Sequence, residues 1–516
     1  MNFDLSLPAQ LSMALAPDLL LFGGTMVLML VAAWRPDGVA HQRRVGIGSL
    51  VLGVIVLGAV IAMSVSGSTG SAAGVIAVDG FRWASDVIFL VAALLTIALS
   101  IEYNAREEIG AGEAHVLVLF ATGGMMIMAA ARDLMVLFLG IELMSVAVYV
   151  LAGLDRRSAR AAEGALKYFL LGAFSTAFLL YGIALVYGAT GSTNLAVIGE
   201  RVVSLQLADS PMLLVGVALL LVGFAFKLAA APFHMWAPDV YEGAPTPITG
   251  FMAAAVKAAA FAALLRTWLE AFPGVYTEWH RAVWWLSAIT MVVGNVIALQ
   301  QRNLKRMLAY SSIGHTGFLL VALASGTSQA ATAFLFYLVA YTLATMGAFA
   351  VISAMGRAGE PRERVEDYHG LWQVRPGLAL AMTVFMLAML GFPVFGGMGF
   401  FAKWYVLQAA LQAPAPQWRL AVVLAVTSAI SVGFYLYVVM VMFMKPRPEG
   451  APAVPRTGAI TRFVIFATAA LILVFGVYPN PIGRLAQATG ALGATPTEQA
   501  ALPAPGAPSG PGALAR

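Results

Sequence analysis

Long apolar stretches separated by short polar connections run along almost the entire chain. About fourteen of them approach the roughly 20 residues that an α-helix needs to cross a bilayer. They lie near residues 11–33, 45–66, 85–100, 115–131, 134–154, 166–187, 212–235, 247–269, 282–299, 307–324, 330–355, 377–412, 420–444 and 463–477. The pattern predicts an all-α polytopic membrane protein with about 14 transmembrane helices.

The stretch at residues 377–412 is too long for one straight crossing. Helix-breaking residues gather near its middle, namely Pro393, Gly396, Gly397 and Gly399. Proline removes a backbone hydrogen bond and glycine permits unwinding. We therefore predict a broken helix, whose free carbonyl groups can hold water.

Two segments share one pattern, P-x-x-G-x-M-x-x-x-x-K. They are PITGFMAAAVK at residues 247–257 and PVFGGMGFFAK at residues 393–403. Interrupted hydrophobic segments at matching positions of two halves mark the binding site of repeat-built transporters. We interpret Lys257 and Lys403 as equivalent positions on two broken helices; a chance match among many glycines and methionines is the alternative.

The basic residues test the span count and predict the topology. The first connection and every second one after it hold eighteen Lys and Arg residues, and the other connections hold six. Because cytoplasmic loops carry the excess of Lys and Arg, both termini are predicted on the non-cytoplasmic side. Residues 1–10 lack the basic segment of a cleavable signal peptide.

Composition agrees with a membrane protein and narrows its chemistry. The 516 residues are 60% hydrophobic and 11% charged, with a mean hydropathy of +0.86. The net charge of +5 arises from basic loops, so it indicates topology and not nucleic-acid binding. With no cysteine, the chain cannot carry a Cys-ligated iron–sulfur cluster, c-type haem attachment or disulfide.

Four charged side chains lie deep inside apolar stretches: Glu142, Lys227, Lys257 and Lys403. Each lysine near a bilayer centre costs roughly 2.5–3.5 kcal/mol, so such residues usually mark an ion path. Burial also favours the neutral form of a lysine. We predict that these lysines bind and release protons, and that Glu142 pairs with one of them, with a static ion pair between helices as the alternative.

Three further polar residues have two interpretations each. Lys167 follows Glu163 by one helical turn, so an interfacial ion pair explains it nearly as well as a proton route. His234 falls seven residues after Lys227 and would share its helix face. His315, in YSSIGHTG, can line a hydrated path or form a simple interhelical hydrogen bond.

Two segments outside the spans differ in composition. Residues 357–375 mix both signs of charge, which is typical of a solvated loop or of a docking surface for a partner subunit. Residues 487–516 are rich in Ala, Pro, Gly and Thr and predict a disordered tail after an antiporter-like domain at residues 1–486.

Several motifs occur in a specific order: GIELMS around Glu142, EGALKYFLLGAFST around Lys167, FKLAAAPFHMWAPDVYEGAPTP, RNLKRMLAYSSIGHTG, VEDYHGL and GFPVFGGMGFFAKWYV. With them the chain, over roughly residues 10–480, resembles the antiporter-like membrane subunits of respiratory complex I, the bacterial NADH-quinone oxidoreductase. Lys403 and VEDYHGL resemble the N type; the M type has a glutamate at the terminal broken helix, and the L type a long lateral helix.

The resemblance implies two inverted five-helix repeats, at about 115–270 and about 282–444, each with one broken helix. It implies that Glu142 and Lys227 form an ion pair in the proton-uptake half, that Lys257 is the central relay, and that Lys403 is the terminal lysine. Lys167 and His234 would join the same hydrophilic axis in secondary roles.

The resemblance also implies a function, which is proton translocation by a multi-pass subunit of the bacterial inner membrane, coupled to electron transfer from NADH to quinone. Its partners would be the lipid bilayer and other complex I membrane subunits, in a hetero-oligomer. NADH, FMN, iron–sulfur clusters and quinone would be used by the complex, with no cofactor and no metal on this chain. The alternatives are a large subunit of an Mrp-type cation/proton antiporter and a non-pumping structural or quinone-docking subunit.

Overall fold

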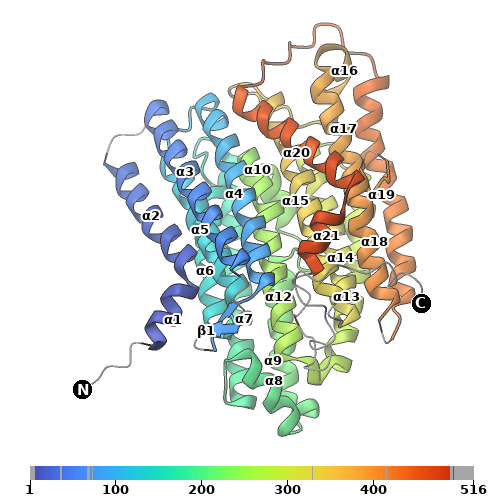
Figure 1. Ribbon diagram of the computed structural model, residues 1–516. Helices are drawn as coiled ribbons and strands as arrows, with labels where there is room; N and C mark the ends of the chain where they lie inside the picture. The colour runs from blue at the N-terminus through green and yellow to red at the C-terminus, as the bar shows by residue number, and fades with distance from the viewer. Residues whose placement is uncertain are drawn as a thin grey trace.

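The structure, a computed structural model, describes residues 6–34, 38–66, 70–72, 74–327, 329–394, 396–413, 415–487 and 492. Within these residues nearly every element is helical, and the single sheet is a two-stranded antiparallel hairpin. Most helices run along one common direction and form a bundle (Figure 1). The predicted all-α polytopic fold is confirmed.

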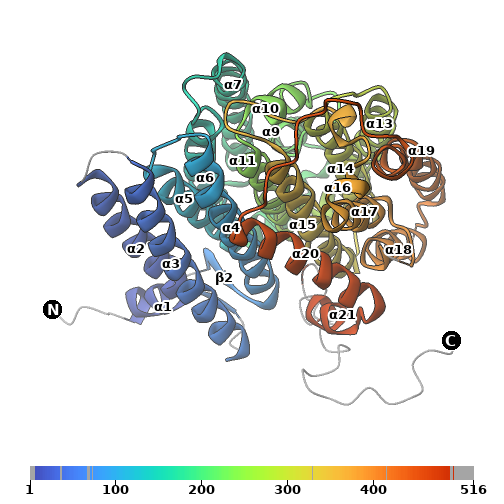
Figure 2. The same cartoon turned by 90° about the horizontal axis from the view of Figure 1, so that it is seen from above.

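The N-terminal helices form one edge of the bundle, with α2 and α3 outermost (Figure 2). Polar residues start several of them; Asp133, for example, accepts a hydrogen bond from the N–H of Met135 at the start of α6. The elements of this part are α1 (Ser6–Ala14), α2 (Ala16–Ala33), α3 (Val39–Val65), β1 (Gly70–Ala72), β2 (Ile76–Val78), α4 (Gly80–Arg106), α5 (Glu113–Ala130), α6 (Leu134–Ala152), α7 (Ala159–Thr190) and α8 (Leu195–Ser204).

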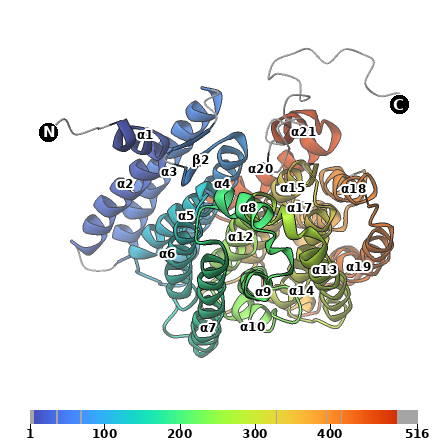
Figure 3. The ribbon, with the colours of Figure 1, turned by 90° about the horizontal axis from the view of Figure 1, so that it is seen from below.

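The remaining elements form the centre and the opposite edge, where α18 and α19 lie (Figures 2 and 3). They are η1 (Leu207–Asp209), α9 (Pro211–Lys227), α10 (Ala237–Gly243), α11 (Thr246–Phe251), the π-helical turn η2 (Met252–Val256), α12 (Lys257–Ala271), η3 (Pro273–Val275), α13 (Tyr276–Ala298), α14 (Leu304–Ser325), α15 (Gln329–Met355), η4 (Val365–Tyr368), α16 (Leu371–Val374), α17 (Pro376–Leu390), α18 (Gly397–Leu411), α19 (Trp418–Met444), α20 (Ala459–Val477) and α21 (Asn480–Gln487).

Three spans form the buried centre of the bundle. The most apolar window of the span Thr246–Ala271 is 100% buried, and those of Leu304–Ser325 and Gln329–Met355 are each 94% buried, against 28% for α2. Polar side chains on these central spans cannot reach bulk water, so they must find their partners inside the protein.

The described part of the chain contains twelve helical spans that are long and apolar enough to cross a membrane. Two shorter apolar helices, α9 and α17, precede the two interruptions described below. Every predicted apolar stretch contains at least one helix of the structure, although two stretches, 212–235 and 377–412, are interrupted. The count of about 14 transmembrane helices stays a prediction. Adding the two interrupted spans to the twelve would give this number.

One predicted helix break is confirmed and the other is wrong. Helix α17 ends at Leu390 and α18 begins at Gly397, as expected. Residues 247–257, in contrast, remain helical through the turn η2, because Pro247 lies in the first turn of α11, where no N–H is needed. The other interruption lies at residues 228–236, between α9 and α10. The shared P-x-x-G-x-M pattern therefore does not mark two equivalent breaks.

The charged segment 357–375 packs on this chain. Val365 and Tyr368 are buried, and the N–H of Leu304 donates to the carbonyl of Glu363 at 2.6 Å. Lys305 also pairs with the Glu363 carboxylate at 3.0 Å. The predicted disordered tail lies, after α21 and apart from residue 492, outside the described residues.

Candidate functional site

Glu142 lies half-buried on α6, facing α7. The hydroxyl of Thr176 on α7 donates a hydrogen bond to Glu142 Oε1 at 2.9 Å. This carboxylate is thus hydrogen-bonded to a neutral hydroxyl, which leaves the charge of Glu142 free to act on groups farther along α6.

Lys227 ends α9, and its side chain is 4% exposed. Its Nζ donates to Ser145 Oγ at 2.8 Å and to Tyr149 Oη at 3.1 Å. Among the ion pairs of the described residues none joins Lys227 to Glu142, so the predicted direct pair is absent from this structure. Glu142, Ser145 and Tyr149 are spaced by three and four residues, which puts them on one face of α6. Two hydroxyl groups therefore stand next to Lys227 on the face that carries Glu142.

The prediction that His234 shares a helix face with Lys227 is wrong. Helix α9 ends at Lys227, and the chain is non-helical from there until α10. The imidazole is half-buried, and its ring centre lies 6.5 Å from that of Tyr310 on α14. This non-helical segment also contacts α14, because the hydroxyl of Thr316 on α14 donates to the carbonyl of Leu228 at 2.9 Å. Residues 228–236 thus connect the Lys227 region to α14.

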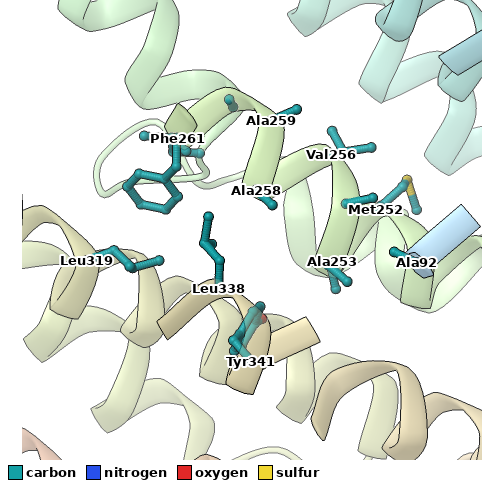
Figure 4. Close-up of a cluster of buried hydrophobic side chains, with 14 of the residues drawn as sticks. Ala92, Met252, Ala253, Val256, Ala258, Ala259, Phe261, Leu319, Leu338 and Tyr341 are labelled. Carbon is teal, nitrogen blue, oxygen red and sulfur yellow. The ribbon is translucent and has the colours of Figure 1, made fainter. Parts of the chain in front are cut away.

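Lys257 is the first residue of α12 and follows the π turn, with 3% of its side chain exposed. Figure 4 shows small side chains of this segment, Ala253 and Ala258, near Leu338 and Tyr341 of α15. Nζ donates to the carbonyl of Ser312 on α14 at 2.7 Å and to the hydroxyl of the same residue. π turns change the direction of side chains and are frequent at functional sites.

Lys403 lies on α18 and is 9% exposed. Its Nζ donates to the carbonyl of Leu390 at 2.8 Å and to Ser428 Oγ on α19 at 3.2 Å. Leu390 is the last residue of α17, so the interruption frees the carbonyl that accepts from Lys403. Nζ also lies 4.8 Å from the ring centre of Phe318. The predicted broken helix thus creates the acceptor for the lysine.

Gly399 allows α18 to approach the end of α17. A Cβ at this position would lie 1.8 Å from the backbone oxygen of Ala388. We expect Gly399→Ala to destabilise the full chain by about 1–3 kcal/mol, because backbone must move to relieve the overlap. The readout is the midpoint of thermal unfolding in detergent, with Gly23→Ala as the control, since a Cβ at Gly23 meets no atom within 4 Å. Equal midpoints for the two variants would contradict this explanation.

His315 connects the Lys257 region to the Lys403 region. Its Nδ1 lies 2.5 Å from Tyr337 Oη and its Nε2 lies 3.0 Å from Tyr435 Oη. Tyr435 is also hydrogen-bonded to Ser311, the neighbour of the Ser312 that binds Lys257.

Between His315 and Lys403 the structure leaves a small cavity of about 10 Å³, bordered by both side chains. This volume is about that of one water-sized probe, and a polar site of that size holds at most one water. A single water there would link the imidazole of His315 to the amine of Lys403.

Sequence reasoning missed several members of this arrangement. Ser145 and Tyr149 follow Glu142 at helical spacing, which is a signal that would have found them. Tyr337, Tyr435 and Ser428 come from distant spans, and nothing in the sequence distinguishes them from other hydroxyls in apolar stretches.

Lys167 lies apart from this row, in an ion-pair network at the surface. It pairs with Glu163 at 2.7 Å and with Asp239 at 2.8 Å, and its side chain is 42% exposed. Asp239 also pairs with Arg306, which in turn reaches Glu242 at 3.1 Å. The structure thus gives Lys167 the interfacial ion pairs that the sequence offered as one interpretation. Among the described residues no group of three His, Asp or Glu side chains is arranged to hold a metal ion.

Comparison with known proteins gives one family. The family model described as "NADH:quinone oxidoreductase/Mrp antiporter, TM" matches residues 131–431. The NADH-quinone oxidoreductase subunit N of Gemmatimonas aurantiaca is 52% identical over 483 residues, which cover 92% of each chain. The protein of the same name from Chloroflexus aggregans is 41% identical and covers 92% of this chain and 96% of its own.

Solved structures show the same similarity. A chain of respiratory complex I from Thermus thermophilus with bound aureothin matches with a TM-score of 0.77 and 37% identity, covering 90% of this chain and 98% of that chain. A chain of the Mrp complex from a Dietzia species matches with a TM-score of 0.82, covering 95% of this chain and 99% of that chain, at 21% identity. At that identity the second match concerns the fold.

Proposed function

Because this chain belongs to the family of NADH-quinone oxidoreductase subunit N, we propose that it translocates protons as a membrane-arm subunit of a bacterial NADH-quinone oxidoreductase. Quinone chemistry in a neighbouring subunit supplies the energy. The chain's own residues bind, hold and pass the protons.

The observation that carries this proposal is the bonding of the three buried lysines. Lys227, Lys257 and Lys403 each donate to hydroxyl or carbonyl oxygens, and no carboxylate pairs with any of them among the described residues. A buried ammonium that pairs with a carboxylate is held in its charged form. With neutral acceptors, both the charged and the neutral amine can keep hydrogen bonds, which is what a residue that gains and loses a proton requires.

The order of the hydroxyl groups gives the route. A proton held at Lys257 passes to the hydroxyl of Ser312, its hydrogen-bond partner. The transfer from Ser312 to the neighbouring Ser311 is a step of the proposal, and from Ser311 the hydrogen bonds run through Tyr435 to His315. From His315 it reaches Lys403 across the small cavity. Glu142, Lys227 and His234 form the uptake side, with Ser145 and Tyr149 beside Lys227; Lys167 acts from the surface network.

Energy reaches this route through charge. Moving one unit charge to about 8 Å from a neighbour, at an effective dielectric of about 20, changes that neighbour's energy by about 2 kcal/mol. This corresponds to more than a factor of ten in proton affinity. A charge change in a neighbouring subunit can therefore change the proton affinity of the next lysine in turn.

The family also supports the setting of the protein. We propose that other complex I membrane subunits surround the chain in a hetero-oligomer, and that NADH, FMN, iron–sulfur clusters and quinone act on those other subunits. The excess of basic residues in alternate loops supports a topology with both termini outside the cytoplasm. The interruptions after α9 and α17 support two inverted repeats, at about 115–270 and about 282–444.

An Mrp-type cation/proton antiporter is the second candidate, because the family description includes it and the Dietzia Mrp complex has the same fold. The curated relatives at 41–52% identity favour the respiratory complex. The two candidates differ in whether proton movement follows NADH oxidation or a sodium gradient.

We test the route with Tyr435→Phe, which removes the hydroxyl between Ser311 and His315 and keeps the ring. Breaking a buried hydrogen bond costs about 1–3 kcal/mol, so NADH-driven proton translocation is expected to fall by about 5- to 150-fold if this cost is added to the barrier of proton transfer. The assay follows proton uptake and NADH oxidation in inverted membrane vesicles. Tyr437→Phe is the matched control, since that ring is 48% exposed on the same helix. Equal pumping by both variants would reject the route, and pumping that followed sodium but not NADH would favour the antiporter.

A further inference from the structure

We propose that Asp18 and Asp86, on either side of Arg82, form a buried site that binds one proton near the hairpin, apart from the lysines. The side chains of Asp18, Arg82 and Asp86 are 2%, 0% and 0% exposed. Arg82 Nη2 donates to Asp18 Oδ2 at 2.5 Å, and Arg82 Nε lies 3.6 Å from Asp86 Oδ2. Arg82 Nη1 is already used by the carbonyl of Ala77 at 2.9 Å.

The hydrogen-bond pattern leaves Asp86 without a donor. Neither of its carboxylate oxygens accepts a hydrogen bond from any described residue, and Asp18 Oδ1 also accepts none. One guanidinium thus stands between two carboxylates and satisfies only one of them. A fully buried carboxylate that lacks donors is strongly destabilised in its charged form and takes up a proton instead.

The net charge of Asp18, Asp86 and Arg82 also indicates that one carboxyl group is protonated. Two ionised carboxylates and one guanidinium leave one net negative charge in a space without access to water. The neighbouring pairs cannot neutralise it, because they are balanced among themselves: Arg266 pairs with Asp79 and Glu270, and Arg132 pairs with Glu270. One proton, shared by the two carboxyl groups, restores the balance.

Helix α12 also packs on α4 and brings two cations, Arg266, which is paired with Asp79 and Glu270, and Lys257, which lies nine residues before it. The other elements that pack on α4 bring no compensating charge to this end. Helices α11 and α15 and the turn η2 carry no charged residue. In the remaining neighbours, the charged and titratable residues lie at the end of the helix far from Arg82: His41, Arg43 and Arg44 on α3, Glu113 and His115 on α5, and Arg462 on α20. Arg484 on α21 is exposed. The negative charge of the two carboxyl groups is therefore neutralised by Arg82 and by the proposed proton.

A metal cation would not fit in place of the proton. The positive guanidinium of Arg82 already lies between the carboxylates, and no described group of three acidic or histidine side chains is arranged as a metal site. The site connects to the rest of the protein through Asp79, which accepts from the N–H of Arg82 at 2.8 Å and pairs with Arg266 on α12 at 2.8 Å. Arg266 follows Lys257 by nine residues, about 14 Å along that helix.

The chain has only ten aspartates, so the proton can be observed directly. The full chain, labelled with 13C at the aspartate carboxyl carbons and reconstituted in phosphatidylcholine bilayers, is measured by solid-state NMR at pH 7. We expect one carboxyl carbon at the chemical shift of a protonated acid. Asp86→Asn and Asp18→Asn are each expected to remove this signal, because one carboxylate then faces one guanidinium. The control Asp209→Asn, at an exposed position, is expected to keep it.

A wild-type spectrum with every aspartate ionised at pH 7 would overturn the proposal, even if neither variant folds. A protonated signal that survives both Asp86→Asn and Asp18→Asn would overturn it too. The measurement needs no electron transfer and no partner subunit, so its outcome is independent of the proposed pumping function.

Discussion

Replacing Lys257 by glutamine is expected to lower NADH-driven proton translocation by about tenfold or more, because a positioned acid–base group contributes roughly 10²- to 10⁴-fold to proton transfer. Glutamine can still donate hydrogen bonds to Ser312, but it cannot bind and release a proton. The substitution therefore removes the relay and leaves the contact between α12 and α14. Proton uptake per NADH oxidised, in inverted vesicles, measures the effect.

Two comparisons make this experiment specific. Lys445→Gln removes a lysine at an exposed position and is expected to leave pumping unchanged. Lys257→Arg keeps a positive charge that cannot be released in a protein, so it is expected to pump as poorly as the glutamine variant. Normal stoichiometry in Lys257→Gln, with the complex assembled, would exclude Lys257 from the route, and full activity of Lys257→Arg would exclude a change of its protonation.

Arg266→Gln is expected to lower the free energy of unfolding by about 3–5 kcal/mol, since it leaves buried acidic partners without their cation. The guanidinium is 1% exposed and donates to Asp79 through both terminal nitrogens, at 2.8 and 2.9 Å. It also reaches Glu270 at 3.0 Å and the carbonyl of Ala129 at 3.0 Å. These bonds fasten the end of α12 to the segment before α4. Titration with SDS in mixed micelles gives the free energy, and Arg281→Gln, at an exposed position on α13, is the control.

The same ion pair predicts a pH dependence. Burial raises the pKa of Asp79, but the Arg266 guanidinium lowers this pKa by more than burial raises it. The pKa of Asp79 therefore lies below the ordinary value of 3.8. A carboxylate with a lowered pKa stabilises the folded protein above its unfolded pKa, and this contribution is lost as the pH falls through the folded value. Wild-type stability is expected to drop below about pH 4, and more steeply than that of Arg266→Gln. Parallel curves for the two proteins would contradict this assignment.

The helices and the buried lysines could be predicted from the sequence because a membrane permits few structures. Backbone groups in lipid must be paired within each segment, so a long apolar stretch becomes a helix. A charge in such a stretch is costly and therefore conspicuous, as Lys227, Lys257 and Lys403 are. The break at Pro393 and its glycines was also visible, because these residues are rare inside stable helices.

The shared pattern at residues 247–257 and 393–403 misled because a proline has two meanings. Pro247 lies in the first turn of a helix, where its missing N–H has no cost, whereas Pro393 lies between the end of α17 at Leu390 and the start of α18 at Gly397. Which meaning applies depends on where the neighbouring helix ends. That position is decided by packing, as at Gly399 against Ala388.

The sequence by itself determined which side chains carry charge inside the membrane, because composition and spacing along one chain suffice to place them in spans. The tertiary structure alone decided what each of them touches. Lys227 has Ser145 and Tyr149 in place of Glu142, and Tyr435 connects Ser311 to His315. Hydroxyl groups are common in apolar helices, and only the packing of helices distant in sequence selects the few that come within hydrogen-bond distance of a buried charge.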